Sequence, residues 1–122
     1  MTAKDEKMYP VFVYGTLMRG EKAAHMLEGY QYCGEYCLKD YAMYNVAHYP
    51  GIKQQAGECV YGEVYLVDAA CVERMDAYEE EGSLYTRKIV TVENEDGKVE
   101  AFVYEYNHES KGEVVRCKWN KQ

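Results

Sequence analysis

Residues Val11–Leu17 have the sequence VFVYGTL, and this stretch carries the strongest fold signal in the chain. Apolar and aromatic residues that favour β-strands lead into a glycine and a threonine. This pattern is typical of a buried strand that ends in a tight loop. Gly15 has no Cβ atom, so the backbone can turn there and another group can approach closely. The backbone amides after Gly15 are therefore candidates for binding an anion or an oxyanion.

A second informative stretch lies further along the chain. Asp68 is a suitable N-cap for a helix over Ala69–Tyr78. Cys71, Val72, Met75 and Tyr78 recur at spacings of three and four, which predicts one apolar helix face. Glu79 comes at the end of this helix. The sequence thus offers one carboxylate together with the possible anion-binding backbone amides after Gly15.

The remaining chain is rich in strand signals. Gly62 within one strand predicts a bulge or a bend at a barrel corner, and Asp96-Gly97 predicts a hairpin. The pattern indicates an α+β fold with a mostly antiparallel, curved sheet. The expected elements are strands at 9–14, 30–38, 41–46, 57–67, 85–93 and 99–106, a short helical stretch at 22–27, a turn at Tyr49-Pro50-Gly51, and a tail that docks through Val114, Val115 and Trp119.

Length and charge limit the classes of function. A chain of 122 residues is the length of a single domain, here 1–122. The net charge is −7, which disfavours binding to nucleic acid or to anionic membranes. No apolar run is long enough to span a bilayer, and the polar N-terminus lacks a secretion signal. We therefore expect a cytoplasmic protein with a small-molecule partner, either a monomer or a weak homo-oligomer.

Cysteine and histidine residues do not form a recognisable framework. The five cysteines are odd in number, which disfavours a set of disulfides in a chain without a secretion signal. Cys33 and Cys37 form the one close pair, and a zinc site would need two further ligands at matching positions. His25, His48 and His108 are scattered along the sequence. We expect buried free thiols and no metal, with a zinc or thiol protein as a remote alternative.

Five short motifs in order resemble the gamma-glutamylcyclotransferase superfamily, in the branch of gamma-glutamylamine cyclotransferase and the AIG2-like proteins. The resemblance covers residues 10–106 and implies a small β-barrel flanked by short helices. The motifs are Tyr14-Gly15-Thr16-Leu17, Tyr49-Pro50-Gly51, Gly62-Glu63-Val64-Tyr65, Met75-Asp76-x-Tyr78-Glu79 and Tyr85-Thr86-Arg87.

The resemblance implies that Glu79 is the catalytic acid and base. A helix C-terminus, neighbouring carboxylates and burial would each raise the pKa of this carboxyl group. On pattern alone, a solvated acidic cluster at a helix end is the better explanation of Glu79, and it is the resemblance that reverses this order. Glu80 and Glu81 remain rivals. Met75 stands where the family usually has leucine, and Glu80-Glu81 replaces a stretch that often begins with glycine.

The same resemblance places substrate-binding groups elsewhere. It implies that Tyr14, Gly15, Thr16 and Leu17 hold the glutamyl group, and that Tyr85 adds a hydroxyl. Tyr14 and Tyr85 could equally be core aromatic residues, and the loop could be a structural turn. We expect Arg87 to pair with a carboxylate rather than to bind substrate.

The reaction implied by the resemblance is the release of 5-oxoproline. The α-amine of a γ-glutamyl amine, or of a related γ-glutamyl compound, attacks its own γ-carbonyl group, and the other amine leaves. No cofactor is needed, because ring closure is intramolecular. The alternative is a catalytically silent module that binds small molecules or partners on the same fold. The sequence leaves the leaving amine unidentified.

Overall fold

The computed structural model describes residues 7–14, 24–46, 49–79, 81–107 and 114–115. Most of these residues lie in strands, with one α-helix after β3 and a short 3₁₀ helix, Ala24–Leu27, before β2. The elements are β1 (Met8–Val13), β2 (Gln31–Val46), β3 (Tyr49–Asp68), α1 (Ala69–Glu79), β4 (Tyr85–Asn94), β5 (Gly97–Tyr106) and β6 (Val114–Val115).

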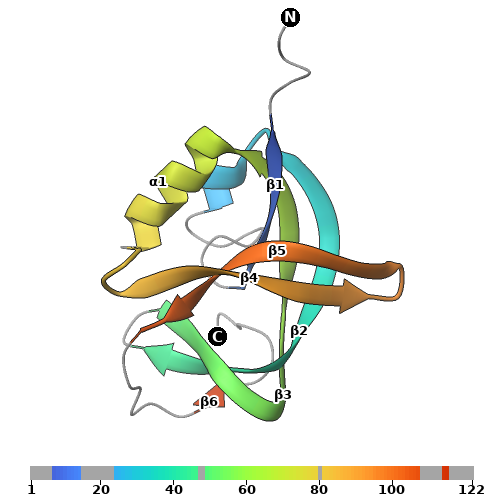
Figure 1. Ribbon diagram of the computed structural model, residues 1–122, viewed down its shortest axis with the longest axis vertical. Helices are drawn as coiled ribbons and strands as arrows, with labels where there is room; N and C mark the ends of the chain where they lie inside the picture. The colour runs from blue at the N-terminus through green and yellow to red at the C-terminus, as the bar shows by residue number, and fades with distance from the viewer. Residues whose placement is uncertain (1–6, 15–23, 47–48, 80, 108–113, 116–122) are drawn as a thin grey trace, which may run out of the picture.

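Five strands close into a ring. Their order is β3-β1-β5-β4-β2, and β2 returns to pair with β3. Every pairing in the ring is antiparallel except the one between β1 and β5, where Val11 lies opposite Phe102. In Figure 1 the β4–β5 hairpin crosses the long strands β2 and β3, and α1 lies at one side of the ring. The predicted α+β fold with a mostly antiparallel barrel is confirmed.

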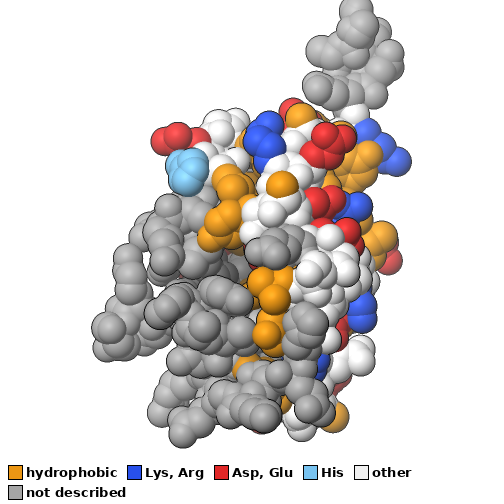
Figure 2. Space-filling view, turned by 90° about the vertical axis from the view of Figure 1, so that its left-hand side faces the viewer, with side chains coloured by type: hydrophobic (Ala, Val, Ile, Leu, Met, Phe, Trp, Pro, Cys, Tyr) orange, Lys and Arg blue, Asp and Glu red, His pale blue; other side chains and the backbone are white. Residues whose placement is uncertain are grey.

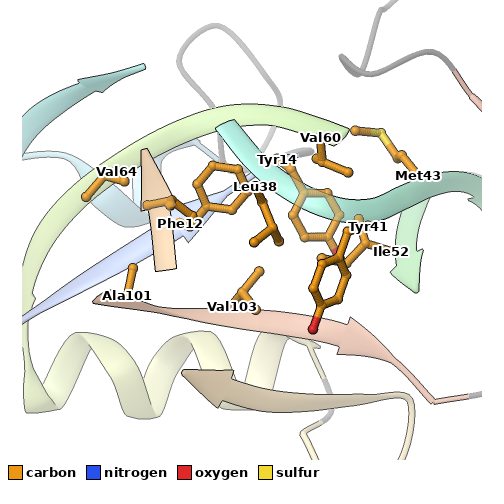
Figure 3. Close-up of a cluster of buried hydrophobic side chains, with 11 residues drawn as sticks. Phe12, Tyr14, Leu38, Tyr41, Met43, Ile52, Val60, Val64, Ala101 and Val103 are labelled. Atoms are coloured by element: carbon orange, nitrogen blue, oxygen red, sulfur yellow. The ribbon is translucent and has the colours of Figure 1, made fainter. Parts of the chain in front are cut away.

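Alternation along the strands produces two hydrophobic cores. Successive side chains of β1 point to opposite faces, so Phe12 and Tyr14 enter one core while Val11 and Val13 enter the other. Figure 3 shows the first core, where Phe12, Leu38 and Val103 meet inside the ring. The second core contains residues of α1 and fixes the helix against the outside of the ring.

The helix α1 begins and ends close to the predicted positions. The Asp68 carboxylate accepts a hydrogen bond from the backbone N–H of Cys71 at 2.9 Å, as expected of an N-cap. Cys71, Val72 and Met75 are buried. Tyr78 was predicted on the same apolar face but is 41% exposed, so that part of the prediction is wrong. A spacing of three residues falls short of the 3.6 residues in a full helical turn. Positions 72, 75 and 78 therefore rotate around the helix axis, and Tyr78 reaches solvent.

The structure corrects several strand boundaries. The strands predicted at 30–38 and 41–46 are one strand, β2, with a register shift between Lys39 and Tyr41 and a left-handed Asp40 (φ 65°). The turn predicted at Tyr49-Pro50-Gly51 is wrong, because these residues begin β3. Here the ladder between β2 and β3 outweighs the local preference of Pro50 for a turn, and it extends to the Val46–Tyr49 pair.

Gly62 has a packing role, and of the two predicted alternatives, a bulge or a bend at a barrel corner, the bulge is wrong. The register between β2 and β3 shifts at Tyr32/Gly34 and at Lys39/Tyr41, and not at Gly62. A Cβ atom on residue 62 would lie 2.3 Å from the carbonyl oxygen of Val13 and 2.8 Å from Cζ of Phe12. Glycine is therefore required where β3 passes closely over the end of β1.

The hairpin and the tail agree with the predictions. Asn94 pairs with Gly97, which leaves a two-residue turn, and the N–H of Asp96 donates to the Asn94 side chain at 2.8 Å. Val114 and Val115 pair with β2 at Tyr44 and Met43. Trp119, the third residue of the predicted docking, lies outside the described residues. The predicted helical stretch at 22–27 is the 3₁₀ helix, described from Ala24 onward.

The described surface carries charges of both signs. In Figure 2, acidic and basic side chains lie side by side over the upper part of one face, and hydrophobic side chains form a narrow stripe below them. None of the helices in the described ranges has the length and apolar character of a bilayer-spanning helix.

Candidate active site

Three of the predicted site residues come from three separate elements. Tyr14 directly follows β1, Glu79 is the last residue of α1, and Tyr85 is the first residue of β4. Both tyrosines are buried, with 8% and 3% of their surfaces exposed. Glu79 and Tyr85 each interact electrostatically with the Tyr14 hydroxyl group and raise its pKa, in addition to the larger effect of burial. The fold therefore brings together residues that are far apart in the sequence.

Glu79 has the electrostatic character of a proton-transfer group. Burial raises the pKa of its carboxyl from the ordinary value of 4.5 to about 7. The sequence suggested three causes, namely the helix C-terminus, neighbouring carboxylates and burial, and burial is the one that the structure supports. Near neutral pH this carboxyl group is divided between its protonated and ionised forms.

The hydroxyl group of Tyr14 is already engaged by the protein. It donates a hydrogen bond to the carbonyl oxygen of Tyr104 at 2.6 Å. It also accepts a hydrogen bond from the backbone N–H of Ile52. A phenol has one proton to donate and two lone pairs. Tyr14 therefore cannot donate to a ligand without losing its bond to Tyr104, but its oxygen retains capacity to accept.

The Tyr85 side chain packs against another aromatic ring. Its ring contacts that of Tyr106 edge to face, with the centroids 5.5 Å apart. Its carbonyl oxygen accepts a 2.7 Å hydrogen bond from the N–H of Gly82, which closes the short connection between α1 and β4. This bond fixes the backbone of residues 82–85, which begin three residues after Glu79.

The rival carboxylates differ from Glu79. Glu81 is exposed, and its carboxylate accepts a 3.4 Å hydrogen bond from the backbone N–H of Arg87. The structure thus directs Glu81 toward solvent and β4, which weakens it as a rival to Glu79. Glu80 lies outside the described residues, as do Gly15, Thr16 and Leu17 of the predicted substrate loop.

Two residues without a predicted role support the site. Asp76 accepts a hydrogen bond from the Tyr104 hydroxyl at 2.6 Å and forms an ion pair with Arg87. Asp76 is thus the carboxylate partner that was expected for Arg87. Asp76 was visible in the sequence as part of a motif, but the contribution of Tyr104 depends on strand pairing that no local pattern reveals.

Within the described ranges, no cluster of three or more Asp, Glu, His or Cys side chains is arranged to hold a metal ion. The described cysteines, Cys33, Cys37, Cys59 and Cys71, are free thiols. Cys71 is buried as predicted, but the other three are only partly buried, so the prediction of buried thiols is wrong for them.

Comparison with known proteins identifies the family of the chain. The profile of the family described as "Gamma-glutamyl cyclotransferase, AIG2-like" matches residues 11–121. The chain belongs to this family. The matched range includes all five motifs and the residues Tyr14, Glu79 and Tyr85.

Members of this gamma-glutamyl cyclotransferase family resemble the chain in sequence. It is 34% identical over 80 residues to the gamma-glutamylcyclotransferase family protein YtfP of Escherichia coli K12, covering 66% of this chain and 70% of YtfP. A Vibrio cholerae relative, whose name assigns it provisionally to the gamma-glutamylcyclotransferases, is 36% identical over 99 residues, covering 80% of this chain and 84% of the relative.

Solved structures of related proteins share the fold. An AIG2-like protein from mouse superimposes with a TM-score of 0.80 at 23% identity, covering 94% of this chain and 97% of the mouse chain, which supports the fold alone. The uncharacterized protein PH0828 of Pyrococcus horikoshii gives a TM-score of 0.71 at 30% identity, with 88% and 86% of the two chains covered.

Proposed function

We propose that this protein is a cofactor-independent cyclotransferase that converts a γ-glutamyl amine, or a related γ-glutamyl compound, to 5-oxoproline and a free amine. The observation that carries the proposal is the partly buried Glu79 at the end of α1, whose carboxyl interacts electrostatically with Tyr14 and has a pKa of about 7. Family membership supports the same class of chemistry.

The chemistry needs one proton acceptor that later becomes a donor. Glu79 takes a proton from the α-ammonium of the glutamyl group, and the resulting amine attacks the γ-carbonyl carbon. The C–N bond of the new five-membered ring forms, and the ring nitrogen then carries one proton more than in the lactam product. Glu79 passes its first proton to the leaving nitrogen as the original γ-amide C–N bond breaks. Glu79 then takes the second proton from the ring nitrogen and passes it to the released amine, which departs as an ammonium. A carboxyl with a pKa near the working pH suits these transfers.

Tyr14 has a limited but useful role in this scheme. Because its proton is donated to Tyr104, its oxygen presents a lone pair rather than a donor toward a ligand. Such an oxygen can accept from the substrate ammonium and orient it toward Glu79. In the proposal, the backbone amides of Gly15, Thr16 and Leu17 hold the α-carboxylate or the oxyanion, and Tyr85 forms part of the pocket wall.

The test is release of 5-oxoproline from a panel of γ-glutamyl amines and γ-glutamyl amino acids. Wild type is compared with Glu79→Gln, and Glu81→Gln serves as the matched control at the same helix end. We expect release by wild type and by Glu81→Gln, and a loss of about 100-fold or more in Glu79→Gln, as is typical when a general base is removed.

Other results would change the proposal. Equal release by wild type and Glu79→Gln would exclude Glu79 as the base. An absence of release from every substrate would favour the second candidate, a binding module that retains the fold without the chemistry. In that case, ligand affinity should be the same in wild type and Glu79→Gln.

A further inference from the structure

The C-terminal half of α1 is attached to the barrel through a cluster of three side chains, which we call the Asp76 cluster (Asp76, Arg87 and Tyr104). One carboxylate oxygen of Asp76 accepts from the Tyr104 hydroxyl at 2.6 Å, and the other forms an ion pair with the Arg87 guanidinium. One helical residue is therefore bound to both β4 and β5.

The Asp76 cluster also holds the segment that leaves the helix. The carbonyl oxygen of Asp76 accepts a 2.9 Å hydrogen bond from the N–H of Glu81. The last carbonyl groups of a helix lack partners within it, and such bonds keep the final turn from fraying. Glu79 lies in this final turn, three residues after Asp76.

Tyr104 connects the helix end to the other side of the site. Its hydroxyl donates to Asp76, while its backbone carbonyl accepts from the Tyr14 hydroxyl. The helix end that carries Glu79 and the Tyr14 side chain are thus both hydrogen-bonded to the same residue of β5. This arrangement is what a fixed distance between the two site residues requires.

We propose that Asp76, Tyr104 and Arg87 are positioning residues that hold the Glu79 carboxyl in its buried place beside Tyr14. The inference rests on the proposed role of Glu79 in proton transfer for its meaning, but the position of that carboxyl can be measured without activity.

The charges in the Asp76 cluster are suited to this role. Arg87 neutralises Asp76, so a second unpaired carboxylate does not stand one turn from Glu79. Burial and the bond to Asp76 raise the pKa of Tyr104, so its hydroxyl keeps the donated proton. The titratable groups that face Tyr14 from other elements are Glu79, Tyr85 and Glu105, and each raises the pKa of the Tyr14 hydroxyl.

The chain supplies a matched control at the opposite end of α1. There the Tyr30 hydroxyl donates to Asp68 at 2.9 Å and accepts from Arg74 at 3.1 Å. This second Asp–Tyr–Arg group attaches the start of the same helix, and its Asp68 lies about 16 Å from Glu79 along the helix axis. Removing the Tyr30 hydroxyl should loosen α1 without moving Glu79.

The experiment compares wild type, Tyr104→Phe and Tyr30→Phe. The Glu79 carboxyl is titrated by NMR in carboxyl-labelled protein, with Glu79→Gln used for assignment, and the pH dependence of 5-oxoproline release is recorded alongside. In Tyr104→Phe we expect water to reach Glu79, so that its pKa falls by about one unit or more toward the ordinary value. The acidic limb of kcat should move with it, and kcat should fall by about 10-fold. Tyr30→Phe should keep the wild-type pKa and profile.

The outcomes separate this inference from the proposed function. An unchanged Glu79 pKa in folded Tyr104→Phe, or an equal shift in Tyr30→Phe, would overturn the positioning role even if the enzyme is active. If the Glu79 pKa shifts in Tyr104→Phe but the wild type releases no 5-oxoproline, the positioning role is supported and the proposed function fails. If Tyr104→Phe does not fold, Asp76→Asn is measured in the same way. Failure of both to fold would make the cluster a determinant of stability and overturn the proposal.

Discussion

The Tyr14 hydroxyl donates a 2.6 Å hydrogen bond to the backbone carbonyl of Tyr104, although 90 residues separate them in the sequence. The bond joins the end of β1 to β5 at the point where these strands form the one parallel pairing of the ring. A single buried contact therefore fixes the register of two strands and the place of a candidate site residue.

Replacing Tyr14 with phenylalanine should separate its structural and functional contributions. Tyr14→Phe leaves the Tyr104 carbonyl without this donor in a buried place, so the free energy of unfolding should fall by about 1–2 kcal/mol. Chemical denaturation measures this loss, and 5-oxoproline release should fall as well. Tyr30→Phe, whose partners can reach water, should lose less stability. An equal loss in both variants would contradict the role of burial.

The buried Glu79 should make stability depend on pH. Its pKa is about 7 in the folded protein against an ordinary 4.5, so the unfolded state loses this proton first as the pH rises. Below about pH 4.5 both states are protonated and the group has no effect; between pH 4.5 and 7 it lowers the stability by up to about 3 kcal/mol, and the loss is complete above pH 7.

Glu79→Gln removes this titration and should reveal it by difference. The variant should become more stable than wild type as the pH rises from 4.5 to 7, as measured by urea denaturation at each pH. Glu81→Gln, at an exposed position, is the control. A stability difference that does not change with pH would show that Glu79 is not buried as described.

Gly62→Ala should be far more damaging than glycine replacements elsewhere. The new methyl group would lie 2.3 Å from the Val13 carbonyl oxygen, and backbone cannot move aside as a side chain can. We expect a loss of about 3 kcal/mol or more. Gly57→Ala is the control, because that site is open and a φ of 86° costs about 1–2 kcal/mol. Similar thermal stabilities for the two variants would contradict the close approach.

The ion pair between Lys88 and Glu105 should matter more than its exposed counterpart. Lys88 Nζ lies 2.9 Å from a Glu105 side chain that is 14% exposed, so Lys88→Met leaves a largely buried carboxylate without its cation. We expect a loss of about 1–2 kcal/mol. Lys39→Met breaks a pair of the same length with Glu93, and there the stability should change little because Glu93, at 31% exposure, can be solvated by water in place of Lys39.

The sequence was sufficient for those features that depend on local chemistry. The Asp68 cap, the buried Cys71–Met75 face and the hairpin at Asp96-Gly97 all follow from residues close together in the chain, and each was confirmed. The barrel itself was implied by the family resemblance. Tyr49-Pro50-Gly51 failed because pairing with β2, rather than the local turn propensity, decides its conformation.

The candidate site could be predicted in part. Glu79 was singled out, although its burial, which determines its pKa, depends on packing that the sequence does not show. The engaged hydroxyl of Tyr14 and the link through Tyr104 depend on which strands become neighbours. The contribution of Gly15, Thr16 and Leu17 stays a prediction, since these residues lie outside the described ranges.

Closure of the ring has a consequence for synthesis of the chain. β1 is made before the other described strands, but one of its two neighbours is β5, which ends at Tyr106. A nascent chain can pair β1 with β3 and form α1 early, yet the ring cannot close until β5 has left the ribosome. Because Tyr104 joins Tyr14 to the helix end only at that stage, the candidate catalytic geometry is among the last features to form, and a prematurely terminated chain would lack it.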